Sequence, residues 1–143
     1  MLQFDFRQVI ARPITEVFEY SSDPQNILAS DPTADVVTTN GTLRKGSDFE
    51  ISFDKGRKNA KVMILEYDQP NLYEFEAHIK MPMAYVMKGS YTFAERDGKT
   101  EMCADMMISD IPSAMEIILK EQIRKLLQEN FEATKSALES KDQ

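Results

Sequence analysis

The chain has 143 residues, enough for one ordinary domain that buries its core without disulfides or metal staples. Its 17 basic and 24 acidic side chains leave a net charge of −7, which repels phosphate backbones, so we expect no nucleic-acid binding. Because the chain has one cysteine and one histidine, we expect no metal and no cofactor. The lack of long apolar runs predicts a soluble cytoplasmic protein with no integral membrane association.

The amino-terminal part of the chain predicts one strand and two short helices. Residues 2–11 alternate between apolar and polar side chains, which is the period of a half-buried strand. Pro13 suits the first turn of a helix, because its missing N–H costs nothing there. The pair Asp23-Pro24 repeats this start signal, and Asp31-Pro32 ends the second helix quickly.

Residues 34–111 predict a meander of six strands, because turn signals separate runs with a period of two. Residues 49–53 and 73–79 alternate most clearly, and residues 84–95 and 100–109 are also apolar on one side. Residues 60–67 are ambiguous, because apolar side chains fall on both sides of this strand. The turn signals are Asn40-Gly41, Lys55-Gly56, Asp68–Asn71, Pro82 and Asp97-Gly98.

The last predicted element is a long amphipathic helix that begins at Ser113 and runs to about Leu138. Ser113 and Glu116 have the spacing of a capping box. At 1.5 Å per residue the helix would be about 38 Å long, so it would cross a sheet whose strands are about 30 Å long. Residues 139–143 look like a frayed tail. The predicted inward stripe is Met115, Leu119, Ile123, Leu126, Asn130, Ala133 and Ala137.

These elements predict a single α+β domain over residues 1–143. One long helix with two short ones is a narrow cover for the apolar face of seven mostly antiparallel strands. A bent sheet wrapped around a single helix leaves space where the two diverge, and small-molecule pockets commonly form in such gaps. We therefore expect a hollow core. Its predicted lining is Phe53, Tyr73, Phe75, Tyr85, Met87, Tyr91, Met102, Met106, Met115 and Leu119.

The order of elements resembles the lipid-transfer and polyketide cyclase/dehydratase superfamily, the START-like proteins of helix-grip fold that include the birch pollen allergens. The segments that carry the resemblance are Ile10–Phe18, Ser22–Pro24, Glu66–Pro70 and Asp97–Thr100. Many members have a tryptophan after the second short helix, whereas this chain has none, so we expect its cavity entrance to differ. The resemblance implies a seven-stranded curved antiparallel sheet around the carboxy-terminal helix and a hydrophobic small molecule as ligand.

Three functions stay open at this point, because the fold does not select among them. The leading hypothesis is a binding module that holds a lipid-like, acyl or polycyclic, polyketide-like molecule between the sheet and the last helix. The alternative is a cyclase or aromatase in which Tyr85 or Tyr91 assists proton transfer. The third is a protein-interaction or chaperone-activator-like domain, for which the apolar outer residues Met63, Leu65 and Tyr67 are the only sign; it would also suit a homodimer.

No catalytic residue is assigned. His78 alternates onto the wet face of its strand, and Cys103 alternates onto the side opposite the expected cavity. The basic turns Arg44-Lys45 and Lys55–Lys58 are interpreted as solvated hairpin tips rather than anion sites. Seven methionines either form an adaptable lining or simply fill the core. These are Met81, Met83, Met87, Met102, Met106, Met107 and Met115.

Overall fold

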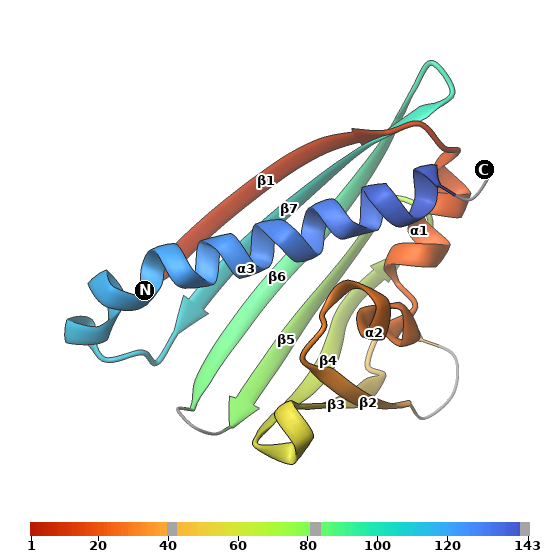
Figure 1. Cartoon of the computed structure of the whole chain (residues 1–143). Coiled ribbons are helices and arrows are strands. Elements are labelled where there is room, and N and C mark those ends of the chain that lie inside the picture. The colour runs from red at the N-terminus through yellow and green to blue at the C-terminus, as the bar shows by residue number, and fades with distance from the viewer. Residues whose placement is uncertain (40–42, 81–83, 141–143) are drawn as a thin grey trace.

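The computed structural model describes residues 1–39, 43–80 and 84–140, and within them seven strands form one antiparallel sheet. The spatial order is β1-β7-β6-β5-β4-β3-β2, so every strand from β2 to β7 pairs with its neighbours in sequence and β1 pairs with β7 (Figure 1). The strands are β1 (Leu2–Ile10), β2 (Ala34–Thr39), β3 (Asp48–Phe53), β4 (Lys58–Asp68), β5 (Leu72–Lys80), β6 (Tyr85–Arg96) and β7 (Lys99–Ser109).

The helices lie on one face of this sheet. Figure 1 shows the long helix α3 (Ser113–Glu139) crossing that face, and α3 packs against β1 and the two short helices. The short helices α1 (Ile14–Ser21) and α2 (Ile27–Ser30) lie between β1 and β2, with the 3₁₀ turn η1 (Pro24–Asn26) before α2. A second 3₁₀ turn, η2 (Asp54–Gly56), connects β3 to β4. The α+β class and the helix-grip architecture expected from the resemblance are confirmed.

Local sequence signals account for several of these boundaries. The Asp23 side chain accepts a hydrogen bond of 3.0 Å from the Gln25 N–H, and Pro24 is the first residue of η1, as predicted. The β6–β7 hairpin turns at Asp97 and Gly98, whose φ values of 54° and 79° suit the Asp-Gly pair of a tight two-residue turn. The predicted turns at Asn40-Gly41 and Pro82, together with Met81 and Met83 and residues 141–143, lie outside the described residues.

The start of α3 differs from the prediction. Pro112 precedes the helix and no side chain caps its first turn, so the capping box between Ser113 and Glu116 is wrong. The Glu116 carboxylate pairs instead with the amino-terminal ammonium group of Met1. A charged partner just before β1 thus replaces the local hydrogen bond that the Ser-x-x-Glu spacing indicates.

A β-bulge in β4 explains why residues 60–67 looked ambiguous. Ile64 pairs with Phe75 on β5, whereas Glu66 pairs with Glu74, which is only one residue further along β5. Leu65 is therefore an extra residue in β4. An extra residue reverses the alternation of side chains beyond it, so no single period describes the whole strand.

The bulge also changes which side chains share a face. Tyr67 lies on the concave face, where its ring packs 5.3 Å from the ring of Phe18, centroid to centroid. Met63 stays on the convex face and is 43% exposed. The apolar outer surface inferred from Met63, Leu65 and Tyr67 is therefore wrong, and the homodimer prediction loses this surface.

Candidate functional site

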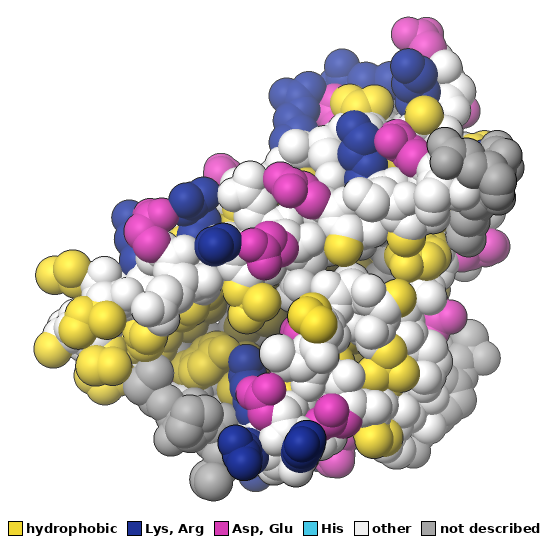
Figure 2. Space-filling view, viewed as in Figure 1, with side chains coloured by type: hydrophobic (Ala, Val, Ile, Leu, Met, Phe, Trp, Pro, Cys, Tyr) yellow, Lys and Arg dark blue, Asp and Glu magenta, His cyan; other side chains and the backbone are white. Residues whose placement is uncertain are grey.

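A cavity of about 240 Å³ lies between the concave face of the sheet and α3. It exceeds the roughly 150 Å³ of an apolar cavity that holds benzene, so it has room for a molecule of one or two rings or for a medium-length acyl chain. Figure 2 shows a hollow with a hydrophobic floor below α3, where the cavity meets the surface. The cavity is therefore open to a ligand.

The sheet supplies most of the cavity wall, because the inward faces of β3 to β7 are apolar at alternate positions. Eight of the ten predicted site residues line it: Phe53, Tyr73, Phe75, Tyr85, Met87, Tyr91, Met102 and Met106. Strand periodicity placed these side chains on the concave face, and antiparallel pairing brings them together.

Met115 and Leu119 do not line the cavity, although they pack against the edge of the core. The first turns of α3 reach beyond the ends of β6 and β7 (Figure 1), and Ile117 and Ile118 in these turns are 86% and 61% exposed. The helix wall of the cavity begins at Ile123. Its members are Ile123, Leu126, Leu127, Asn130, Phe131 and Thr134.

Two tyrosines contribute polar groups to the wall: Tyr73, which is buried, and Tyr91, which is partly buried. The Tyr73 hydroxyl donates a 2.8 Å hydrogen bond to the Ser21 carbonyl oxygen, and the Tyr91 ring lies 5.0 Å from the Tyr73 ring. Burial raises the pKa of Tyr91 to about 12, and burial together with Tyr91 and Tyr67 raises the pKa of Tyr73 well above its usual value. Among the described residues none forms a hydrogen bond with the Tyr91 hydroxyl. Both hydroxyls stay protonated at neutral pH; the Tyr73 proton is donated to Ser21, whereas the Tyr91 hydroxyl can donate a hydrogen bond to a ligand.

Lys58 also lines the cavity, although its basic run predicts a solvated hairpin tip. It is the first residue of β4 and pairs with Phe53, and its ammonium nitrogen lies 5.1 Å from the centroid of the Phe53 ring. Ala60 and Val62 are predicted to point inward, so the alternation of the strand predicts another inward side chain two residues earlier, at position 58. The basic run that follows Gly56 is typical of a turn, and it conceals this strand signal.

The other reactive side chains lie away from the cavity, as predicted. His78 is exposed on the convex face, with its Nε2 atom 3.4 Å from a Glu76 carboxylate oxygen. Cys103 is half-buried, with its Sγ atom 3.9 Å from Glu101. Among the described residues, no group of three or more His, Cys, Asp or Glu side chains is arranged to hold a metal ion.

The sequence matches a known protein family along almost its whole length. Residues 1–139 match the model of the family described as polyketide cyclase/dehydrase and lipid transport. The chain belongs to this family. No curated protein matches the sequence. In the described part of this polyketide cyclase/dehydrase family member, no helix is both long enough and apolar enough to cross a bilayer.

Solved structures share the fold of this family member at low sequence identity. A conserved protein from Geobacillus kaustophilus has a TM-score of 0.76 at 12% identity, covering 96% of this chain and 95% of that chain. A protein from Chromobacterium violaceum has a TM-score of 0.75 at 15% identity, covering 96% of both chains. DynU16, a protein of the dynemicin biosynthetic locus, has a TM-score of 0.72 at 12% identity, covering 96% of this chain and 47% of that chain. At these identities the likeness concerns the fold alone.

Proposed function

We propose that this family member binds a hydrophobic small molecule in the cavity between the sheet and α3. The observation that carries the proposal is a largely apolar cavity of about 240 Å³ that opens to the surface. Each buried methylene group of a ligand contributes roughly 0.8 kcal/mol, so burial of the apolar body would be the main favourable term. The preformed wall lowers the cost of ordering side chains on binding.

A few polar groups on the wall would orient this ligand. The Tyr85 and Tyr91 hydroxyls and the Asn130 amide have no hydrogen-bond partner among the described residues. In an apolar pocket, a small number of unpartnered polar groups fixes the direction in which a ligand lies. We therefore expect a ligand with an apolar body and at least one oxygen.

The proposal is tested with the neutral fluorescent dye N-phenyl-1-naphthylamine. Met87 lines the cavity, so Met87→Arg would place a charge in its wall and weaken dye binding by tenfold or more. Met63→Arg is the matched control, because Met63 lies on the convex face of the same sheet and should bind the dye like the parent. Equal dye affinity of Met87→Arg and the parent, with circular dichroism showing both folded, would exclude the cavity as the binding site.

A cyclase or dehydratase activity is the second candidate, and the Tyr91 hydroxyl favours it. Because burial raises the pKa of Tyr91 to about 12, this group would act as a proton or hydrogen-bond donor to a substrate carbonyl oxygen rather than as a base. With a polyketide-like substrate, Tyr91→Phe should lower kcat by about 10²-fold while dye binding stays close to that of the parent. An unchanged kcat would remove Tyr91 from the mechanism.

A further inference from the structure

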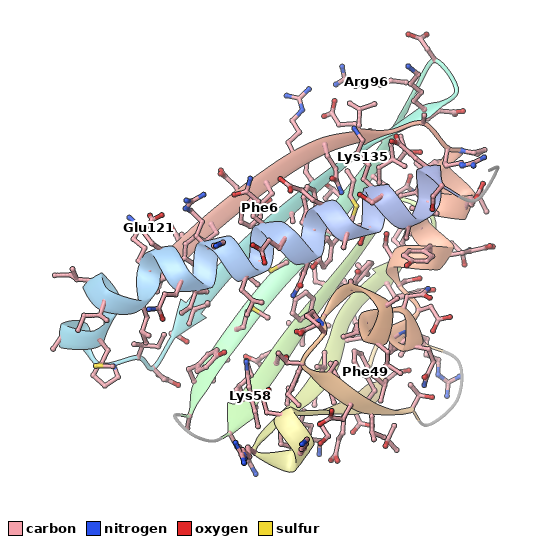
Figure 3. The ribbon with its side chains drawn as sticks, viewed as in Figure 1. Phe6, Phe49, Lys58, Arg96, Glu121 and Lys135 are labelled. Carbon is pink, nitrogen blue, oxygen red and sulfur yellow. The ribbon has the colours of Figure 1, made fainter. Side chains whose placement is uncertain are left out.

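Lys58 places an ammonium group on an otherwise apolar stretch of the cavity wall. Lys58 of β4 pairs with Phe53 of the neighbouring strand β3, and Phe53 is buried. Paired residues of neighbouring strands point to the same face of the sheet. Figure 3 shows Lys58 beside η2, at one end of the sheet. The methylene stem therefore lies along the concave face, and the charged end lies at the edge of the cavity.

The Lys58 ammonium group has no carboxylate partner in the part of the chain that the structure describes. Its nitrogen lies over the Phe53 ring, and none of the described Asp or Glu side chains comes within ion-pair distance of it. Two other lysines near β4 are paired on the outside: Lys45 lies 3.0 Å from Glu66, and Lys61 lies 4.0 Å from Asp48. A cation–π contact leaves the three N–H donors of the ammonium group free, so they can serve an anion from outside the chain.

The acidic side chains on the wall already have local partners. Asp31 accepts hydrogen bonds of 2.9 Å and 2.7 Å from the N–H and hydroxyl of Thr33, and Asp23 accepts one from the Gln25 N–H. Lys58 is the only cationic side chain among the described residues that line the cavity. Because the whole chain carries a net charge of −7, its average field repels anions, and selection of an anion has to come from a local group.

We propose that the ligand is an amphipathic monocarboxylate, and that Lys58 binds its carboxylate while the apolar body fills the cavity. This inference rests on the proposed function and names the ligand class. Tyr85 lies at the same end of the sheet, since it pairs with Ile79 next to the start of β4, and none of the described residues forms a hydrogen bond with its hydroxyl, which is a second donor. One ammonium group and one hydroxyl match a carboxylate, whereas a phosphate dianion would call for more donors.

The test uses two pairs of acids and neutral amides that displace N-phenyl-1-naphthylamine. Decanoate is compared with decanamide and 2-naphthoate with 2-naphthamide, at about pH 7.5, where carboxylic acids are ionised. In the parent we expect the better-fitting acid to displace the dye about tenfold more tightly than its amide, because hydrogen bonds to charged groups are the strong ones. In Lys58→Met the acid should lose about tenfold in affinity, and the amide should stay within about twofold.

Lys80→Met is the matched control. Lys80 is exposed on the convex face, and its neighbour across β4 and β5 is Asn59, so this variant removes the same charge from the same end of the sheet. It should keep the preference for the acid. Failure of the parent to bind the dye would overturn the proposed function and the inference together. Dye binding with acids no better than amides, or with a preference that survives Lys58→Met, would overturn the inference alone.

Discussion

Gly89 shapes the floor of the cavity through the side chain that it lacks. It lies on β6 between Phe75 of β5 and Met106 of β7, and both neighbours line the cavity. A Cβ atom at position 89 would lie 2.6 Å from the Phe75 ring and 2.5 Å from the Met106 sulfur. Because real Cβ atoms do not approach so closely, both side chains depend on a glycine beneath them.

Gly89→Ala should lower the free energy of unfolding by about 1–3 kcal/mol, the usual cost of overpacking a core. The opposing gain, the reduced freedom of the unfolded chain, is only about 0.4–1 kcal/mol. Urea denaturation of Gly89→Ala and of the convex-face control Ser90→Ala would measure the difference. Ser90→Ala should stay within about 0.5 kcal/mol of the parent. A Gly89→Ala variant as stable as the parent would mean that Phe75 and Met106 move aside freely.

Helix α3 is anchored by its carboxyl half. Phe131 and Leu138 are buried, and the Phe131 ring lies 5.8 Å from the Phe6 ring of β1. The Gln8 side chain donates a 2.9 Å hydrogen bond to the Phe131 carbonyl oxygen, and Arg12 donates one to the Leu138 carbonyl oxygen. Among the described residues, the amino half is held by the exposed ion pair between Glu116 and the Met1 ammonium group, and it carries the exposed Ile117 and Ile118.

Phe131→Ala should therefore cost far more stability than the removal of an apolar side chain from the amino half of α3. We expect a loss of about 3 kcal/mol, near the lower end for phenylalanine truncation, because part of the Phe131 ring faces the cavity. Ile118→Ala, which also shortens an apolar side chain of α3, should change stability by less than about 0.5 kcal/mol. Thermal unfolding of the two variants would measure this contrast. Similar losses in both would show that α3 is held along its whole length.

Periodicity predicted the strands better than it predicted the helix, for a physical reason. In β5 to β7 a period of two assigns each side chain to one of two faces, and these assignments hold at Tyr73, Met87 and Met102. In α3 the predicted stripe included Ala133 and Ala137, whereas the buried residues are Phe131 and Leu138. A stripe shifted by one residue along the helix is also compatible with the helical period. Contact with β1 selects the stripe that contains Phe131 and Leu138.

The errors within the sheet have local causes. Leu65 forms a bulge that no period of two can represent, so the face of Tyr67 could not be predicted from alternation. Lys58 was missed because strand boundaries are harder to place than strand interiors, and a basic run after Gly56 is typical of a turn. The coarse architecture did not depend on either residue, which is why the fold and most of the wall were predicted correctly.

For the whole molecule, a hollow core places two tyrosine hydroxyls where their ionisation is costly. Burial raises the pKa of Tyr91 to about 12 and that of Tyr73 well above its usual value of about 10. The folded chain therefore holds these protons more tightly than the unfolded chain does. The corresponding stability is fully present below about pH 10 and is lost as the pH rises through about 12, because the unfolded chain releases its protons first.

The unfolding free energy of the parent should accordingly fall between about pH 10 and about pH 12, and that of Tyr91→Phe should fall less steeply. Lysines also titrate in this range, but they are the same in both proteins, so the difference between the two curves isolates Tyr91. Urea denaturation at several pH values would give both curves. Tyr73 is unchanged in the variant and should keep part of the decline. Parallel curves would show that Tyr91 ionises as easily in the folded chain as in the unfolded chain, and that water reaches its hydroxyl in the cavity.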